Sequence, residues 1–250
     1  MSKATTLRAL HVPGTPVVLP NAWDAASARM MESAGFAGVA TSSVATAAVL
    51  GYDDGEQAPV DEVLAATARI VRSVAVPVTV DFERGYRLSP AELVDRLAAI
   101  GVAGVNLEDS DPAGGTMIDP GEQAEFLAAV RAAAGDTLVI NARIDVFLRQ
   151  AGTTDEQFTG AIKRAAAYLE AGADCVYPLG LGDLDRLGDL VTETPGPVNV
   201  AYGQGAHSLA DYAARGAARI TFGPMLQRTL YGRLSSTLGA LTADRNPFAG

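Results

Sequence analysis

Cysteine and long apolar runs are nearly absent from this sequence, and positive charge is scarce. The one cysteine, Cys175, excludes an internal disulfide and a thiolate metal cluster. No apolar run reaches the roughly 18 residues of a membrane span, and the N-terminal segment lacks the apolar core of a signal peptide. The 19 Lys plus Arg against 29 Asp plus Glu disfavour nucleic acid and anionic membranes as partners, because both bind basic surfaces. We therefore expect a cytoplasmic protein.

What the chain has instead is a repeated pattern of helix, glycine and strand. Helix-like stretches end in Gly35, Gly101, Gly172 and Gly216, and a short apolar stretch follows each of them. Glycine readily adopts the left-handed conformation that ends a helix. Four further apolar stretches are entered through Pro or Gly. Together they predict eight buried strands, at about 16–20, 37–41, 77–82, 103–107, 137–142, 174–178, 197–201 and 218–222.

Eight short strands alternating with Ala-rich helical segments predict a (β/α)8 TIM barrel, formed as a single domain over residues 1–250. The rival is a doubly wound open sheet. A nucleotide-binding member of that class has a glycine-rich loop after its first strand, whereas this chain has "PNAWDAAS" there. With 48% hydrophobic residues, the chain has enough apolar material for a large core.

In such a barrel the active site lies where the strands end, and acidic side chains gather there. Asp81 and Glu83 lie at the end of the third strand, on the same side of it, and Glu108 ends the next strand. Any one of them is more often a helix cap or an arginine partner, so the cluster is better evidence than its members. Three convergent carboxylates repel one another unless a cation lies among them. Oxygen ligands without His or Cys suit Mg²⁺, with Mn²⁺ as the alternative.

Other candidate site residues follow the remaining strands. Arg143 is placed to hold a substrate carboxylate or phosphonate through a forked pair of hydrogen bonds. Asn21 and Trp23 follow the first strand and are predicted to bind substrate. The two histidines, His11 and His207, are predicted at the surface or in loops, and Cys175 is predicted as a small buried hydrophobe inside a strand.

Four segments of the chain resemble the isocitrate lyase/phosphoenolpyruvate mutase superfamily: "LPNAWDAASARMMESAGFAGVATSSVATAAVLGYDDGE", "VDFERGY", "GVNLEDS" and "INARIDVF". The resemblance implies a Mg²⁺ site at Asp81, Glu83 and Glu108, with Asp54 nearby and Arg143 on the substrate carboxylate. It also implies that the backbone N–H groups of three residues face the substrate, namely Ser42, Ser43 and Val44. The chemistry implied is an enolate of a small 2-oxo acid, stabilised by the metal. A homo-oligomer, dimer or tetramer, with an exchanged last helix is implied as well.

The chain departs from this family where the specific reaction is decided. The family's isocitrate-cleaving lyases carry Lys, Cys and His in the loop after the fourth strand, and this chain has "SDPAGGTMIDPGEQ" there. Tyr86 and Tyr202 are the remaining candidate proton carriers. Three hypotheses follow. The first is a Mg²⁺-dependent lyase or decarboxylase that acts on a carbon–carbon bond of a small 2-oxo or 2-hydroxy carboxylate through a metal-stabilised enolate. The second is a hydrolase or mutase that acts on the phosphorus–carbon bond of a phosphonopyruvate-like substrate, and the third is a non-catalytic ligand-binding barrel. Arg84, beside the carboxylates, has no explanation at this level.

Overall fold

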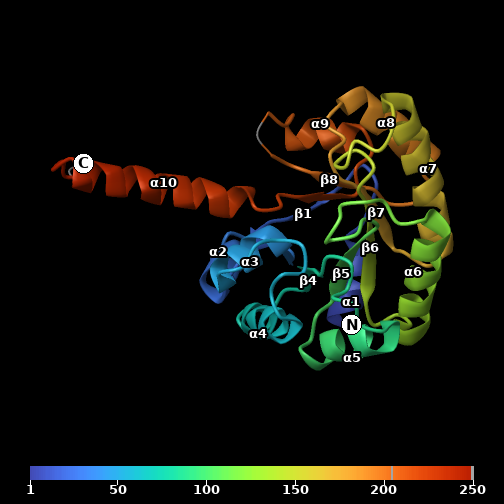
Figure 1. Cartoon of the computed structure of the whole chain (residues 1–250), viewed down its shortest axis with the longest axis horizontal. Coiled ribbons are helices and arrows are strands. Elements are labelled where there is room, and N and C mark those ends of the chain that lie inside the picture. Colours follow the sequence, from blue (N-terminus) through green and yellow to red (C-terminus); the bar gives the residue numbers. More distant parts are fainter. Residues whose placement is uncertain (204, 249–250) are drawn as a thin grey trace.

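A closed parallel barrel forms the centre of the molecule in the computed structural model, which describes residues 1–203 and 205–248 (Figure 1). The first barrel strand is split at Pro20, which has no backbone N–H to donate, into β1 (Val17–Leu19) and β2 (Asn21–Ala22). The other strands are β3 (Val39–Thr41), β4 (Val78–Asp81), β5 (Gly104–Glu108), β6 (Val139–Ile144), β7 (Cys175–Pro178), β8 (Asn199–Ala201) and β9 (Arg219–Thr221).

All strand pairs are parallel, and they close the ring that the sequence predicts. β2 to β7 pair in chain order, and β9 lies between β1 and β8. A single parallel bridge from Val176 to Val198 joins β7 to β8. All eight predicted strand positions overlap observed strands, so the (β/α)8 barrel is confirmed and the open sheet is excluded.

Helices connect the strands and cover the outside of the barrel (Figure 1). Several begin at the polar caps or first-turn prolines that favour helix starts, such as Ser89–Pro90, Asp119–Pro120 and the capping box of Thr153 with Glu156. The helices are α1 (Lys3–Ala9), α2 (Ala25–Ser33), α3 (Ser43–Leu50), α4 (Val60–Val71), α5 (Pro90–Ala99), α6 (Pro120–Ala134), α7 (Thr154–Glu170), α8 (Leu184–Glu193), α9 (Leu209–Ala214) and α10 (Met225–Thr242).

The inside of the barrel changes character along its axis. At the strand starts, Leu7 of α1 packs in a small apolar cluster with Val17, Leu19 and Val139. Polar side chains follow further along, where Asn141 Nδ2 and Arg219 Nη2 both donate to Asn106 Oδ1, at 2.9 and 3.2 Å. The carboxylates come last, at the strand ends. The fold therefore seals one end of the barrel with apolar groups and leaves its polar chemistry at the other.

His11 lies in a loop beside this sealed end, which is one of the two predicted settings, but it is buried there, whereas His207 is exposed. Its Nδ1 donates to Leu7 O at 2.8 Å, and two residues distant in sequence, Arg219 and Asp174, are close enough for their charges to act on the ring. Nε2 has no partner among the described residues. Burial, followed by the charge of Arg219, lowers the pKa of His11 from 6.5 to about 4.

This lowered pKa predicts that His11 reduces the stability of the folded protein in mild acid. Between pH 6.5 and about 4 the unfolded chain binds a proton at His11 and the folded chain does not, so His11 lowers the free energy of unfolding as the pH falls. From pH 7 to pH 5 the His11 contribution is a loss of about 2 kcal/mol. Two buried glutamates with raised pKa values, Glu83 and Glu108, act in the opposite direction, and they do so equally in the parent and in His11→Leu. In urea unfolding, the change in the free energy of unfolding from pH 7 to pH 5 should therefore be about 2 kcal/mol less favourable in the parent than in His11→Leu. The same change in both proteins would show that His11 is not the group responsible.

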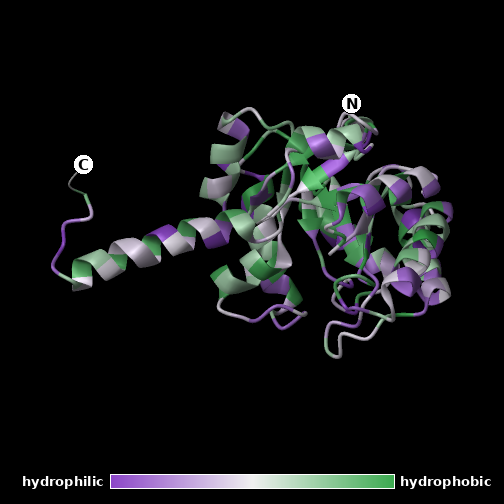
Figure 2. Cartoon of the chain, turned by 90° about the horizontal axis from the view of Figure 1, so that it is seen from above, coloured by the Kyte–Doolittle hydropathy of each residue, from purple (hydrophilic) through white to green (hydrophobic). Residues whose placement is uncertain are grey.

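The last helix, α10, leaves the barrel and projects away from it (Figure 1). Its start is tied down by Gln227, whose Nε2 donates to Ala45 O at 2.8 Å. Beyond this point Leu230, Leu234, Leu238 and Leu241 are each about half exposed. Figure 2 shows the same mixture of hydrophobic and hydrophilic residues along the helix. Among the described residues, no helix is both long enough and apolar enough to cross a membrane.

Candidate active site

Asp81 ends β4 and points into the mouth of the barrel. Its backbone N–H donates to Thr41 Oγ1 at 2.9 Å, and its Oδ2 accepts the backbone N–H of Ser43 at 3.0 Å. Ser43 begins α3, so the positive end of that helix faces the carboxylate. The side chain is only partly buried. Asp81 is therefore oriented by the neighbouring strand while it stays open to the mouth.

Glu83 lies one turn further on and is almost fully buried. Both of its carboxylate oxygens accept hydrogen bonds, Oε1 from the Tyr86 hydroxyl and Oε2 from the Glu56 N–H, each at 2.7 Å. Its backbone has a φ of +48°, which a residue with a side chain seldom adopts. Burial, and then the charges of Asp54 and Asp81, raise the pKa of Glu83 to about 7.

Glu108 ends β5 beside Glu83, and its backbone N–H donates to Glu83 O at 2.9 Å. Its Oε2 lies 2.7 Å from Arg143 Nη1. Burial raises the pKa of Glu108 to about 8, against the opposing charge of Arg143, and the charges of Asp145 and Asp81 act in the same direction as burial. A second positive charge at this place would therefore stabilise the ionised carboxylates.

Arg143, on β6, is held by two carboxylates. Its Nε and Nη2 donate to Asp145 at 2.7 and 2.9 Å, and Nη1 pairs with Glu108. Asp145 is itself fixed by the Ser110 hydroxyl at 2.7 Å. Although burial alone would lower it, the pKa of Arg143 is raised by Glu108 and Asp145. Of the five N–H groups of the guanidinium, two have no partner among the described residues, which leaves them for a substrate anion.

Asp109 supports this arrangement from behind. One of its oxygens accepts the backbone N–H of Asp145 at 2.8 Å, and the other accepts Arg164 Nη1 at 2.9 Å and the Tyr168 hydroxyl at 2.8 Å. Asp109 and Asp145 are fully buried. Every oxygen in this network has a donor, which is the condition for burying charge without a large loss of stability. Arg143 is thus set in place by a layer of residues beneath it.

The other predicted site residues divide into two groups. Asp54 is close to the cluster, because Ser43 and Asp81 both influence its pKa, which burial raises. Asn21 is occupied within the fold: its Nδ2 donates to Thr41 O at 2.6 Å and its Oδ1 accepts the Phe222 N–H at 2.7 Å. Trp23 lines an apolar groove of 490 Å³ between α2 and α10. Asn21 thus has hydrogen-bond partners within the fold and Trp23 lies in a groove, and the prediction that the two residues contact substrate stays a prediction.

Some of the polar groups at the start of α3, which were predicted to face the substrate, already have hydrogen-bond partners within the protein. The Ser42 hydroxyl caps the helix by accepting the Ala45 N–H at 3.4 Å, and the Ser43 N–H donates to Asp81. Val44 follows them in the first turn of the helix.

Tyr202, the second predicted proton carrier, packs against Tyr212 and Phe222, with ring centres 6.2 and 5.4 Å away, in an aromatic cluster next to β8.

Arg84 points away from the carboxylates, which answers the question that its sequence position raises. Its guanidinium donates to Gln123 Oε1 at 2.5 Å and to Glu122 Oε1 at 2.7 Å, and lies over the Phe126 ring. Gln123 is fully buried and its Nε2 donates to Glu108 O at 3.2 Å. Arg84 therefore fastens the turn after β4 to α6, through a glutamine that also holds the end of β5.

No three His, Cys, Asp or Glu side chains form a ready metal-binding arrangement within residues 1–203 and 205–248. The chemistry of the donor set still fits Mg²⁺. This ion keeps several waters and is bound by one or two carboxylates rather than by a protein cage. Asp81, Glu83 and Glu108 provide oxygen ligands only, and their mutual repulsion contributes to the raised pKa values of the two glutamates. Mg²⁺ is thus a proposal that rests on ligand type and charge.

Sequence reasoning missed the residues that support the site. Asp109 and Ser110 lie in "LEDS", and Asp145 lies two residues after Arg143, so their spacing to named residues was a usable signal. Glu56 and Gln123 had no such signal. Their importance arises from contacts across 27 and 15 residues of sequence, which only the fold reveals.

Comparison with known proteins adds independent findings. A sequence model of the family described as phosphoenolpyruvate phosphomutase matches residues 7–242. An uncharacterized protein of Mycobacterium tuberculosis is 36% identical over 215 residues, covering 86% of this chain and 80% of the relative. Oxaloacetate decarboxylase 2 of Pseudomonas putida is 34% identical, covering 79% and 66%. A Burkholderia cenocepacia crystal structure, provisionally described as a phosphonomutase, has a TM-score of 0.87 at 39% identity and covers 96% of this chain and 99% of its own.

Proposed function

Because the chain belongs to the isocitrate lyase/phosphoenolpyruvate mutase superfamily, we propose that it is a lyase that cleaves a carbon–carbon bond of a small 2-oxo or 2-hydroxy carboxylate with the help of Mg²⁺. The observation that carries the proposal is the placement of Arg143 directly against Glu108, beside Asp81 and Glu83. A guanidinium with open N–H groups next to a cluster of carboxylates suits a substrate anion together with a divalent cation.

Each side chain has a defined task in this proposal. Asp81, Glu83 and Glu108 hold the metal, directly or through water. Arg143 binds the substrate carboxylate through its two open N–H groups, and Asp145 keeps the guanidinium plane in position. When bound, Mg²⁺ stabilises the negative charge that develops on the keto oxygen as the carbon–carbon bond breaks.

Tyr86 is the best-placed proton carrier of the two that the sequence suggested. Its hydroxyl donates to Glu83 at 2.7 Å, and burial followed by the charge of Glu83 raises its pKa. The phenol therefore stays protonated. If it gives its proton to a reacting atom, the phenolate that remains must take a proton back from Glu83. Tyr202, in its aromatic cluster, is the less favourable candidate.

Cleavage or rearrangement of a phosphorus–carbon bond is the second candidate function. The observation in its favour is the likeness to the Burkholderia cenocepacia structure, at 39% identity over almost the whole chain. The same arginine can hold a phosphonate as readily as a carboxylate. The likeness to an oxaloacetate decarboxylase supports the first candidate instead.

A substrate screen with and without Mg²⁺ tests both candidates. Oxaloacetate, malate analogues and phosphonopyruvate are incubated with the protein, and pyruvate, carbon dioxide, inorganic phosphate and phosphoenolpyruvate are measured. Mg²⁺-dependent pyruvate formation without phosphate would support the lyase. Release of phosphate from phosphonopyruvate, or its conversion to phosphoenolpyruvate, would favour the second candidate, and inertness toward all of them would favour the non-catalytic binding barrel.

We also propose that α10 packs against a second copy of the chain to form a homo-oligomer, dimer or tetramer. Leu230, Leu234, Leu238 and Leu241 are spaced along one helix and are about half exposed. The start of α10 lines the apolar groove with Trp23, Met30 and Phe36. An apolar helix and an apolar groove on one molecule are complementary surfaces for two copies.

Replacing Leu234 by Glu should dissociate this oligomer. The substitution places a charge in the centre of the apolar stripe, where burial against a partner would be costly. Ser235→Glu is the matched control, since it adds the same charge at an exposed residue outside the stripe. Light scattering coupled to size-exclusion chromatography should give a smaller mass for Leu234→Glu only. A parent protein that elutes as a monomer would contradict the proposed oligomer.

A further inference from the structure

The turn that carries Glu83 is held in an unusual backbone conformation. Of residues 83–87, four have positive φ: Glu83 at +48°, Gly85 at +101°, Tyr86 at +54° and Arg87 at +57°. Gly85 is the only glycine among them, and a side chain there would collide with Leu93. Each of the other three costs of order 1 kcal/mol, so the turn keeps this shape only because its surroundings hold it.

Glu56, in the loop between α3 and α4, is the residue that faces this turn from outside. Its backbone N–H donates to Glu83 Oε2, and its side-chain Oε1 accepts the Tyr86 N–H, both at 2.7 Å. The Tyr86 hydroxyl donates to Glu83 Oε1 in return. The three residues form a closed set of hydrogen bonds, which we call the Glu56 clasp. Glu56 itself has a φ of +56°, so both sides of the clasp are constrained.

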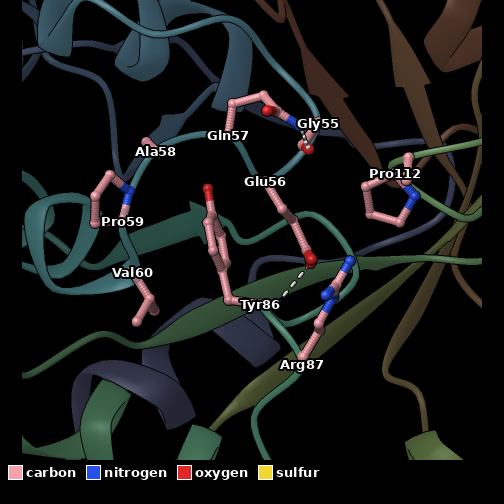
Figure 3. Close-up of a pocket in the computed structure, with 10 residues that line it drawn as sticks. Gly55, Glu56, Gln57, Ala58, Pro59, Val60, Tyr86, Arg87 and Pro112 are labelled. Atoms are coloured by element: carbon pink, nitrogen blue, oxygen red, sulfur yellow. Dashed lines mark hydrogen bonds between the residues drawn. The ribbon is translucent and has the colours of Figure 1, made fainter.

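Figure 3 shows the Glu56–Tyr86 part of the clasp among the residues that line a pocket of 440 Å³, with the Glu56 carboxylate directed at the Tyr86 backbone and Arg87 beside it. Pro112, from the loop after β5, lines the same pocket. A Cβ on Gly55 would lie 3.1 Å from Pro112 O, so the two loops approach each other closely. The clasp thus joins the loop of Glu56 to the turn of Glu83, and the loop after β5 lies close to the same place.

We propose that Glu56 is a positioning residue, which holds both the turn and the carboxylate plane of Glu83 in the orientation that the active site uses. Glu56 itself takes no part in the chemistry. Its side chain fixes Tyr86, Tyr86 fixes one oxygen of Glu83, and the Glu56 backbone fixes the other. This inference rests on the proposed function at one point, which is the role of Glu83 as a metal ligand.

Two substitutions distinguish the hydrogen bond that the Glu56 side chain accepts from the negative charge that it carries. Glu56→Gln keeps an oxygen that can accept the Tyr86 N–H, whereas Glu56→Ala removes it. Gln57→Ala, at an exposed residue of the same loop, is the matched control. Hydrogen exchange of residues 83–88 is measured first without metal, and Mg²⁺ affinity is then measured by titration calorimetry without substrate.

In Glu56→Ala we expect faster exchange over residues 83–88 and an affinity for Mg²⁺ that is about 10- to 100-fold weaker, the usual effect of losing a residue that orients a metal ligand. Glu56→Gln and Gln57→Ala should resemble the parent in both measurements. Unchanged exchange in Glu56→Ala would overturn the clasp. Faster exchange with unchanged Mg²⁺ affinity would overturn its positioning role. If the parent itself binds no Mg²⁺, the proposed function fails, and the exchange result alone decides whether the clasp exists.

Discussion

Replacing Arg143 by Lys should lower the kcat/KM for the substrate by about a hundredfold or more while the protein stays folded. Lysine keeps the positive charge between Glu108 and Asp145 but cannot present two N–H groups in one plane, so it loses the forked contact with the substrate anion. Losing one well-placed donor to a developing anion costs about 10²- to 10³-fold in rate. Alanine would be a poor choice, because it leaves two buried carboxylates without a partner.

The matched control for this experiment is Arg131→Lys. Arg131 also pairs with a carboxylate, that of Asp174, but does so at the sealed end of the barrel. Both variants are compared by steady-state kinetics and by thermal unfolding. We expect a large kinetic defect only in Arg143→Lys. A near-normal kcat/KM in that variant would remove Arg143 from substrate binding and leave it a structural role within its carboxylate network.

Asp81→Asn should reduce Mg²⁺-dependent turnover by about 10³-fold, because polarisation of the substrate by a bound metal is worth several kcal/mol. The asparagine keeps an oxygen that can accept the Ser43 N–H, so the local fold is preserved. Removing one charge from a group of repelling carboxylates should leave the melting temperature equal or slightly higher. Turnover is measured across a Mg²⁺ titration, together with thermal unfolding.

Asp95→Asn, at an exposed residue of α5, controls for the loss of one negative charge from an acidic protein. It should behave as the parent does. If Asp81→Asn also turns over substrate normally at every Mg²⁺ concentration, Asp81 is not a metal ligand. If the parent has no turnover and Asp81→Asn changes no binding property either, the barrel is a non-catalytic binder.

The barrel was predictable because its signals are local. Gly35 and Gly101 end helices that the next strand follows within a few residues, and the strand segments are short, buried and rich in Val and Ile. The carboxylates were predictable for the same reason, since Asp81, Glu83 and Glu108 each lie at or just beyond the end of a strand. Parallel strands in chain order bring such ends together without further information.

What the local sequence leaves open depends on contacts between distant segments. Asn21 Oδ1 accepts the Phe222 N–H across 201 residues, and the burial of His11 follows from the closure of the barrel, which the local pattern does not show. Arg84 finds its partners on α6 rather than at the carboxylates beside it in sequence. A charged side chain next to a predicted site can point into the site or toward another part of the fold. Packing, rather than distance in the sequence, decides which of the two it does.

The proposed site, in which Arg143 and a carboxylate-held Mg²⁺ together bind a small carboxylate, is tested by measuring the binding of oxalate with and without Mg²⁺. Oxalate resembles the enolate of pyruvate, so a site built from Arg143 and a carboxylate-held metal should bind it by charge and shape. Titration calorimetry should give a clear binding isotherm in the presence of Mg²⁺ and none after the metal is removed with a chelator. Equal binding in both conditions would contradict the account, because it would place the anion on the protein alone.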